Sequence, residues 1–133
     1  MSEPEENDGE HAREMLAMAR KDLRALEHMQ DAAAFEDEIF GFHAQQAIEK
    51  TLKAWMAHRG LAYPLTHNLE VLLTALREEG AEVDPFWTLE RYTDFAVMLR
   101  YEALEKDMPE ARPKIVEQVK RLIQHVDQRL AEA

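Results

Sequence analysis

Three short polar patches contain the residues whose types and spacing could do chemistry. The first is a narrow polar stripe, on an otherwise apolar helical segment, made of Gln46, Glu49, Lys50 and Lys53. Steps of three and four residues place these side chains on one side of a helix. The spacing alone fits a solvated face in which Gln46 pairs with Lys50 one turn on, and it fits a functional patch equally well.

The other two patches contain a histidine and an arginine. Thr66, His67 and Asn68 stand at the start of a predicted helix, where Thr66 is a candidate N-cap. Arg100 and Tyr101 follow a run of five apolar residues, 95–99. An arginine there needs a partner if it is buried, and Glu49 would serve, in which case the pair merely supports the fold.

Several classes of active site are excluded by what the chain lacks. There is no cysteine, so thiol nucleophiles and thiolate metal sites are ruled out. A Ser-His-Asp hydrolase site is rejected because its nucleophile would have to be the only serine, Ser2, in the acidic N-terminal segment. None of the six histidines has a glutamate three residues before it, as the helical di-iron motif requires. The four glycines are isolated, so no phosphate-cradling loop exists. We therefore expect no metal, no cofactor and no conventional catalytic set.

Helical periodicity runs through most of the 133 residues and predicts an all-α fold. Apolar residues recur at steps of three and four, and the breaks fall at glycine or proline. Five helices are predicted. The first begins near residue 11, and the second spans about 35–59. The third follows Thr66, the fourth follows Asp84-Pro85, and the fifth covers about 115–130. The segment 35–59 is apolar around most of its circumference, so it should lie centrally or face a second protein chain. We predict an up-and-down five-helix bundle.

Charge and the two ends of the chain limit the function further. Residues 1–10 hold five acids and no base, which predicts a disordered acidic leader before a helical domain of residues 11–133. The formal charge of −11 opposes broad binding to nucleic acid or to anionic membranes. No apolar run approaches the length of a membrane span, so we expect a cytoplasmic protein without membrane contact.

The same three patches resemble the signature of HEPN domains (higher eukaryotes and prokaryotes nucleotide-binding). The similar segments are 42–54 (FHAQQAIEKTLKA), 66–73 (THNLEVLL) and 99–102 (LRYE). They occur in the right order, and the resemblance spans about residues 11–130. It implies a helical bundle that commonly dimerises and is often encoded beside a minimal nucleotidyltransferase, in pairs that behave as toxin and antitoxin.

Ribonucleases of this family use an Arg-x(4 to 6)-His motif, and this chain does not contain it. Arg100 is followed at the required positions by residues 105–107, which are Glu, Lys and Asp. Seven residues separate Arg59 from His67, one too many, and three separate Arg121 from His125, one too few.

The resemblance therefore implies a binding subunit without ribonuclease activity, a homodimer, and a nucleotide or RNA ligand with a nucleotidyltransferase partner. The residues it gathers in one phosphate-binding cleft are Gln46, Glu49, Lys50, His67, Arg100 and Tyr101. Two alternatives remain open: a ribonuclease that uses a displaced pair, Arg59 or Arg100 with His67, and a purely structural interaction subunit.

Overall fold

The computed structural model describes residues 3–96 and 108–132, with side chains from residue 9 onward, and this part of the chain is helical. Four α-helices and one 3₁₀ helix follow one another: α1 (Glu3–His28), α2 (Asp37–His58), α3 (Leu69–Glu78), η1 (Asp84–Phe95) and α4 (Arg112–Ala131). The predicted all-α fold of five helices is confirmed. Within the described residues, no helix combines the length and apolar character needed to cross a bilayer.

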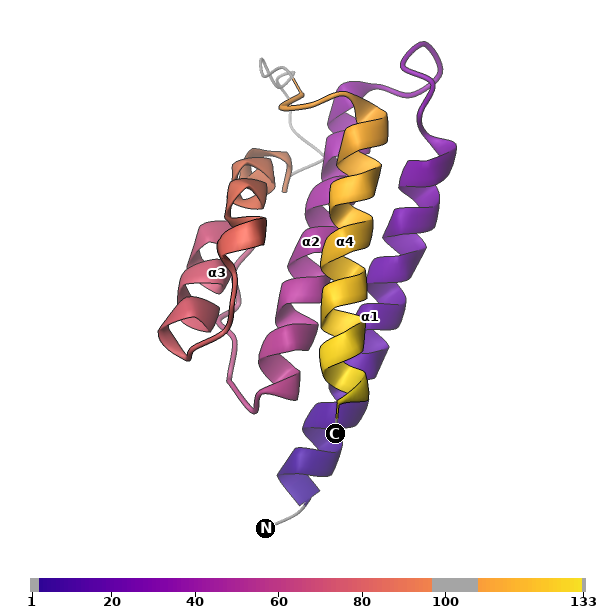
Figure 1. Cartoon of the computed structure of the whole chain (residues 1–133). Helices are drawn as coiled ribbons and strands as arrows, with labels where there is room; N and C mark the ends of the chain where they lie inside the picture. The colour runs from indigo at the N-terminus through magenta and orange to yellow at the C-terminus, as the bar shows by residue number, and fades with distance from the viewer. Residues whose placement is uncertain (1–2, 97–107, 133) are drawn as a thin grey trace.

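α2 is the central helix of the molecule (Figure 1). It contacts α1, α3, η1 and α4, and thirteen consecutive residues, Gln45–Ala57, include only two that are not buried, Gln46 and Lys50. α1 runs antiparallel to both α2 and α4, while α3 and η1 cover another side of α2. The apolar circumference of α2 is thus buried within one chain. The pattern that suggested a second copy against α2 has an explanation inside the monomer.

α1 begins at Glu3, inside the acidic segment for which the sequence predicts disorder. Pro4 stands in the first turn of this helix, where its missing N–H removes no hydrogen bond. Acidic side chains near a helix N-terminus also interact favourably with the helix dipole, so the same charges that suggest a solvated leader are compatible with a helical start.

The fourth predicted helix is present, but it is wound as a 3₁₀ helix. Its buried side chains are Phe86, Leu89, Tyr92 and Phe95, each three residues from the next. A period of three residues matches the 3₁₀ helix, in which residues three apart lie above one another. The α-helical period predicted for the helix after Asp84-Pro85 was therefore wrong between residues 84 and 95.

Two positions of the fold, one after α2 and one inside it, require glycine. Gly60, with φ of 72°, follows α2, as the sequence predicts for a helix C-terminus. Gly41 packs so closely against the Phe95 ring that a Cβ at position 41 would stand 2.2 Å from its Cδ1. The end of η1 is thereby packed directly on the backbone of α2.

A buried arginine holds the loop between α1 and α2. Arg112, in the first turn of α4, donates from Nη1 to the carbonyl oxygen of Met29 at 2.6 Å and from Nη2 to that of Phe35 at 2.6 Å. Nη2 also meets Asp37 Oδ1 at 2.9 Å, and the guanidinium lies 4.8 Å from the centre of the Phe40 ring. These contacts satisfy a buried cation with the protein's own groups.

Candidate functional site

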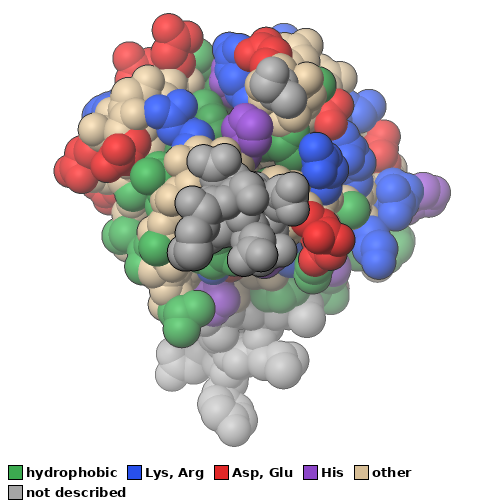
Figure 2. Space-filling model, turned by 90° about the horizontal axis from the view of Figure 1, so that it is seen from below, with side chains coloured by type: hydrophobic (Ala, Val, Ile, Leu, Met, Phe, Trp, Pro, Cys, Tyr) green, Lys and Arg blue, Asp and Glu red, His purple; other side chains and the backbone are tan. Residues whose placement is uncertain are grey.

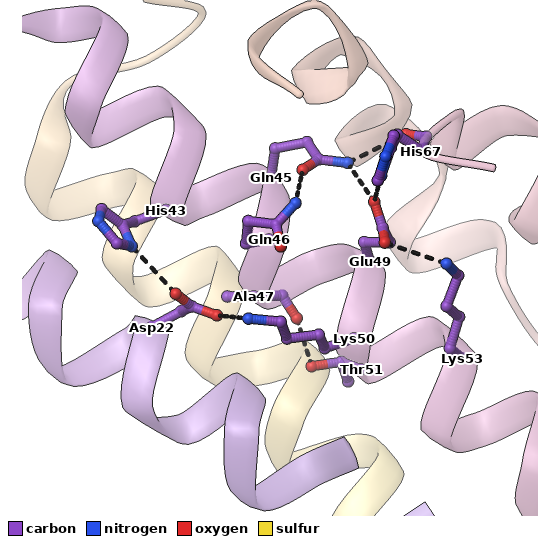
Figure 3. Close-up of polar contacts among 10 residues, drawn as sticks. All are labelled: Asp22, His43, Gln45, Gln46, Ala47, Glu49, Lys50, Thr51, Lys53 and His67. Carbon is purple, nitrogen blue, oxygen red and sulfur yellow. Dashed lines mark hydrogen bonds and ion pairs between the residues drawn. The ribbon is translucent and has the colours of Figure 1, made fainter. Parts of the chain in front are cut away.

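The polar stripe of α2 divides between two neighbouring lines of the helix (Figure 3). Gln45, Glu49 and Lys53 follow one line at four-residue steps, and His43 and Lys50 follow the next at a seven-residue step. Each line is organised by one buried carboxylate. We call these groups the Glu49 cluster (Gln45, Glu49, Lys53, His67) and the Asp22 cluster (Asp22, His43, Lys50).

In the Glu49 cluster, three donors converge on one carboxylate. Oε1 of Glu49 accepts hydrogen bonds from Nε2 of Gln45 at 2.9 Å and from Nδ1 of His67 at 2.7 Å. Oε2 accepts from Nζ of Lys53 at 3.0 Å. The side chains of Glu49 and Lys53 are 7% and 10% exposed, whereas that of His67 is 64% exposed. A buried anion therefore supports an imidazole at the surface.

The protonation of this cluster follows from its hydrogen bonds. Burial by itself would raise the pKa of Glu49, but the hydrogen bonds from Gln45, His67 and Lys53 outweigh it and lower the pKa. An ionised carboxylate can only accept, so the proton in the hydrogen bond belongs to Nδ1 of His67. The second ring nitrogen, Nε2, has no hydrogen-bond partner among the described residues.

Gln45 connects the carboxylate to the loop that precedes α3. Its Nε2 donates to the backbone carbonyl of His67 at 3.0 Å as well as to Glu49, and its Oε1 accepts from Nε2 of Gln46 at 2.8 Å. Gln45 is fully buried, so both the backbone and the ring of His67 are held from α2. Asn68, and not Thr66 as predicted, is the N-cap of α3, accepting from the backbone N–H groups of Glu70 and Val71.

The other end of this loop is fastened to α1. The hydroxyl group of Tyr63 lies 2.5 Å from Nε2 of His11, and the two rings are stacked. Nζ of Lys53 lies 5.4 Å from the centre of the Tyr63 ring. Lys53 therefore contacts the groups that hold both ends of the loop. It pairs with Glu49, which binds His67, and it lies over the ring of Tyr63.

The Asp22 cluster repeats the same chemistry between α1 and α2 (Figure 3). Oδ1 of Asp22 lies 3.0 Å from Nδ1 of His43, and Oδ2 accepts from Nζ of Lys50 at 2.7 Å. The Asp22 side chain is 11% exposed, and those of His43 and Lys50 are 26% and 20% exposed. Lys50, predicted for the same cleft as Glu49, is thus engaged with α1 instead.

The structure therefore assembles part of the predicted site. Glu49 and His67 meet directly, Gln46 joins them through Gln45, and Lys50 stands in the adjoining Asp22 cluster. Arg100 and Tyr101 lie outside the described residues, so the predicted contact between Glu49 and Arg100 stays a prediction. Sequence reasoning missed the roles of Asp22, His43 and Gln45, although His43 and Gln45 are within the segment that carries the resemblance.

The near-miss arginine and histidine pairs do not form a site. Arg59 donates to the backbone carbonyl of Glu79, whereas His67 contacts Glu49. Glu49 precedes Arg59 by ten residues, which is about 15 Å along the axis of a helix. His125 packs against the rings of Trp55 and Phe86, with centroid distances of 5.0 and 5.1 Å. Nowhere in the described part of the chain do three or more His, Asp or Glu side chains converge to hold a metal ion.

Comparison with known proteins identifies the fold that carries these clusters. The family model of the HEPN domain matches residues 12–129, which is most of the chain. The chain belongs to the HEPN domain family. Neither curated proteins nor solved structures gave a match. Both carboxylate clusters lie within the matched HEPN segment, which also includes residues 100 and 101.

Proposed function

We propose that this HEPN-domain protein is a binding subunit that receives a nucleotide or an RNA phosphate at the Glu49 cluster, without cleaving it. The observation that carries the proposal is the exposed imidazole of His67 held on the buried carboxylate of Glu49. In the imidazolium form both ring nitrogens donate, so Nδ1 stays on Glu49 while Nε2, which has no partner among the described residues, donates to a phosphate oxygen. Lys53 contributes a second cation to the same cluster.

Arg100 and Tyr101 complete the proposed ligand site by resemblance to the family. An arginine there would bind phosphate through two donors, and a tyrosine would stack on a base or bond a sugar. The proposed biological setting is a homodimer paired with a minimal nucleotidyltransferase, in a locus of the toxin and antitoxin type. This setting rests on the family resemblance and on the absence of the Arg-x(4 to 6)-His spacing from the sequence.

Fluorescence anisotropy with a labelled oligouridylate of about 8 nucleotides tests the site. His67→Ala should weaken binding about tenfold, the effect of losing one charged hydrogen bond. The matched control is His28→Ala, because His28 is also exposed but its Nδ1 contacts the backbone carbonyl of Arg24, far from the Glu49 cluster. Equal affinities for wild type and His67→Ala would remove the Glu49 cluster from the proposal.

Gel analysis of the same oligonucleotide tests the absence of cleavage. We expect wild type and His67→Ala to leave the RNA equally intact, since the described residues bring no arginine to His67. Cleavage by the wild type that is lost in His67→Ala would instead establish the displaced-pair ribonuclease. Co-expression with a nucleotidyltransferase encoded beside the gene, followed by affinity purification, tests the proposed partner.

A further inference from the structure

The outer face of α1 has no partner in the described part of the structure. α1 packs on α2 and α4, and it forms one edge of the bundle in Figure 1. Five exposed residues follow one line along its outer face, at alternating steps of four and three residues. They form what we call the α1 stripe, which consists of Glu10, Glu14, Ala17, Lys21 and Arg24.

Charge is segregated along the α1 stripe. The end nearer the N-terminus is acidic, with Glu10 and Glu14, while the other end is basic, with Lys21 and Arg24. Ala17, a small side chain, separates the halves. Arg13 lies at the edge of the stripe towards α4, where it lines a pocket with Arg20 and Asp127.

None of the four charged residues of the α1 stripe takes part in an ion pair among the side chains that the structure describes. Neighbouring cations behave differently: Arg20 pairs with Asp127 and Lys120 pairs with Glu27. Glu10 and Glu14 are one helical turn apart, as are Lys21 and Arg24, so each half of the stripe places like charges beside each other. Such pairs destabilise a helix unless opposite charges come near.

We propose that a second copy of this chain covers the α1 stripe, with the two α1 helices antiparallel. This arrangement sets Glu10 opposite Arg24 of the second copy and Glu14 opposite its Lys21. Because a two-fold axis repeats every contact, the same pairs form again on the other side of Ala17, where the helices cross. A parallel arrangement would place like charges together, so the sequence of charges selects the antiparallel one.

The rest of the surface supports this choice of face. Seen from below in Figure 2, most of the visible Lys and Arg side chains lie on the side of α1, where Asp and Glu side chains stand among them. Residues 69–95 contain seven acids and two bases, so a second copy would be repelled from that side by its own excess of acid. The homodimer predicted from the family resemblance would thus form through α1 instead of α2. This choice of interface does not depend on the proposed nucleotide site.

A charge-exchange experiment tests the proposed interface, with analytical ultracentrifugation as the readout. One variant combines Lys21→Glu with Arg24→Glu, and the other combines Glu10→Lys with Glu14→Lys. Each alone should dissociate at least tenfold more readily than wild type, since four attractive contacts become repulsive. An equimolar mixture of the two should restore a dimer of one copy of each. For the wild type, raising NaCl from about 0.05 M to about 0.5 M should weaken the dimer.

The control variant combines Glu78→Lys with Glu82→Lys, which changes the net charge as much but on the side of α3, and it should dimerise like wild type. Circular dichroism checks that all variants remain helical. A wild type that is monomeric at low salt, or a mixture that stays monomeric, would overturn the proposal. So would a monomer that binds RNA through Lys21 and Arg24, because the α1 stripe would then be a nucleic-acid surface.

Discussion

The Glu49 and Asp22 clusters use the same chemistry for different ends. Each places one buried carboxylate between the Nδ1 of a histidine and the Nζ of a lysine. In the Asp22 cluster both donors are similarly shielded, and the carboxylate joins two long helices. In the Glu49 cluster the lysine is deeply buried and the histidine is mostly exposed. The difference teaches that the histidine of such a cluster stays exposed when it comes from a loop and is shielded when it comes from a packed helix.

The largest effect should come from removing the Glu49 carboxylate. Glu49→Ala leaves the ammonium of Lys53 buried without its anion, which should lower the free energy of unfolding by about 3 kcal/mol. Urea unfolding followed by circular dichroism measures the change. The control Glu78→Ala, on the exposed side of α3, should change stability by less than about 0.5 kcal/mol. A comparable small loss in Glu49→Ala would show that Lys53 reaches water unaided.

Acid should remove the contribution of Glu49 specifically. Hydrogen bonds hold the folded-state pKa of Glu49 below its ordinary value of 4.5, so its stabilisation is complete above that pH. The stabilisation is lost as the pH falls through the lower folded-state pKa. Wild type should exceed Glu49→Gln by about 2 kcal/mol near neutral pH, the cost of losing hydrogen bonds to a charged group. Urea titrations at decreasing pH should show this gap closing, whereas a constant gap would contradict the ionised state.

Asp22→Ala should cost less than Glu49→Ala, about 1 kcal/mol. The side chains of His43 and Lys50 are both more exposed than that of Lys53, so each can regain water when its partner is removed. The same unfolding assay compares the two variants directly. If Asp22→Ala proved the more damaging, exposure would not be what distinguishes the clusters.

A histidine without a carboxylate sharpens the comparison. Burial lowers the pKa of His125, as does the charge of Arg129, while Glu82 and Glu132 oppose the shift. Its Nε2 is buried without a hydrogen-bond partner in the part of the chain that the structure describes. The unfolded chain therefore binds a proton more readily, so stability falls as the pH drops through 6.5. His125→Phe should gain about 1 kcal/mol at mildly acidic pH, by thermal denaturation. An equal gain at alkaline pH would point to packing alone.

Periodicity predicted most of the fold because each long helix buries a face with the α-helical spacing. It failed at residues 84–95, where buried side chains recur every three residues and the winding is tighter. For the site, spacing on α2 located Glu49 but could not identify its neighbours. Asp22 lies on another helix and His67 on a loop, and only tertiary packing decides which line of α2 each one meets. The contact of Lys50 with Asp22 therefore could not be predicted from α2 alone.

Arg112 has a consequence for the order in which the chain can fold. It belongs to the last helix, yet it satisfies the backbone of the loop between the first two, across 75 to 83 residues of sequence. During synthesis α1 and α2 leave the ribosome long before α4, so the loop of their hairpin must wait for the donor that later binds its carbonyl groups. The α1–α2 hairpin should therefore tighten late, and a nascent chain that stops before α4 should remain open to proteases at residues 29–37.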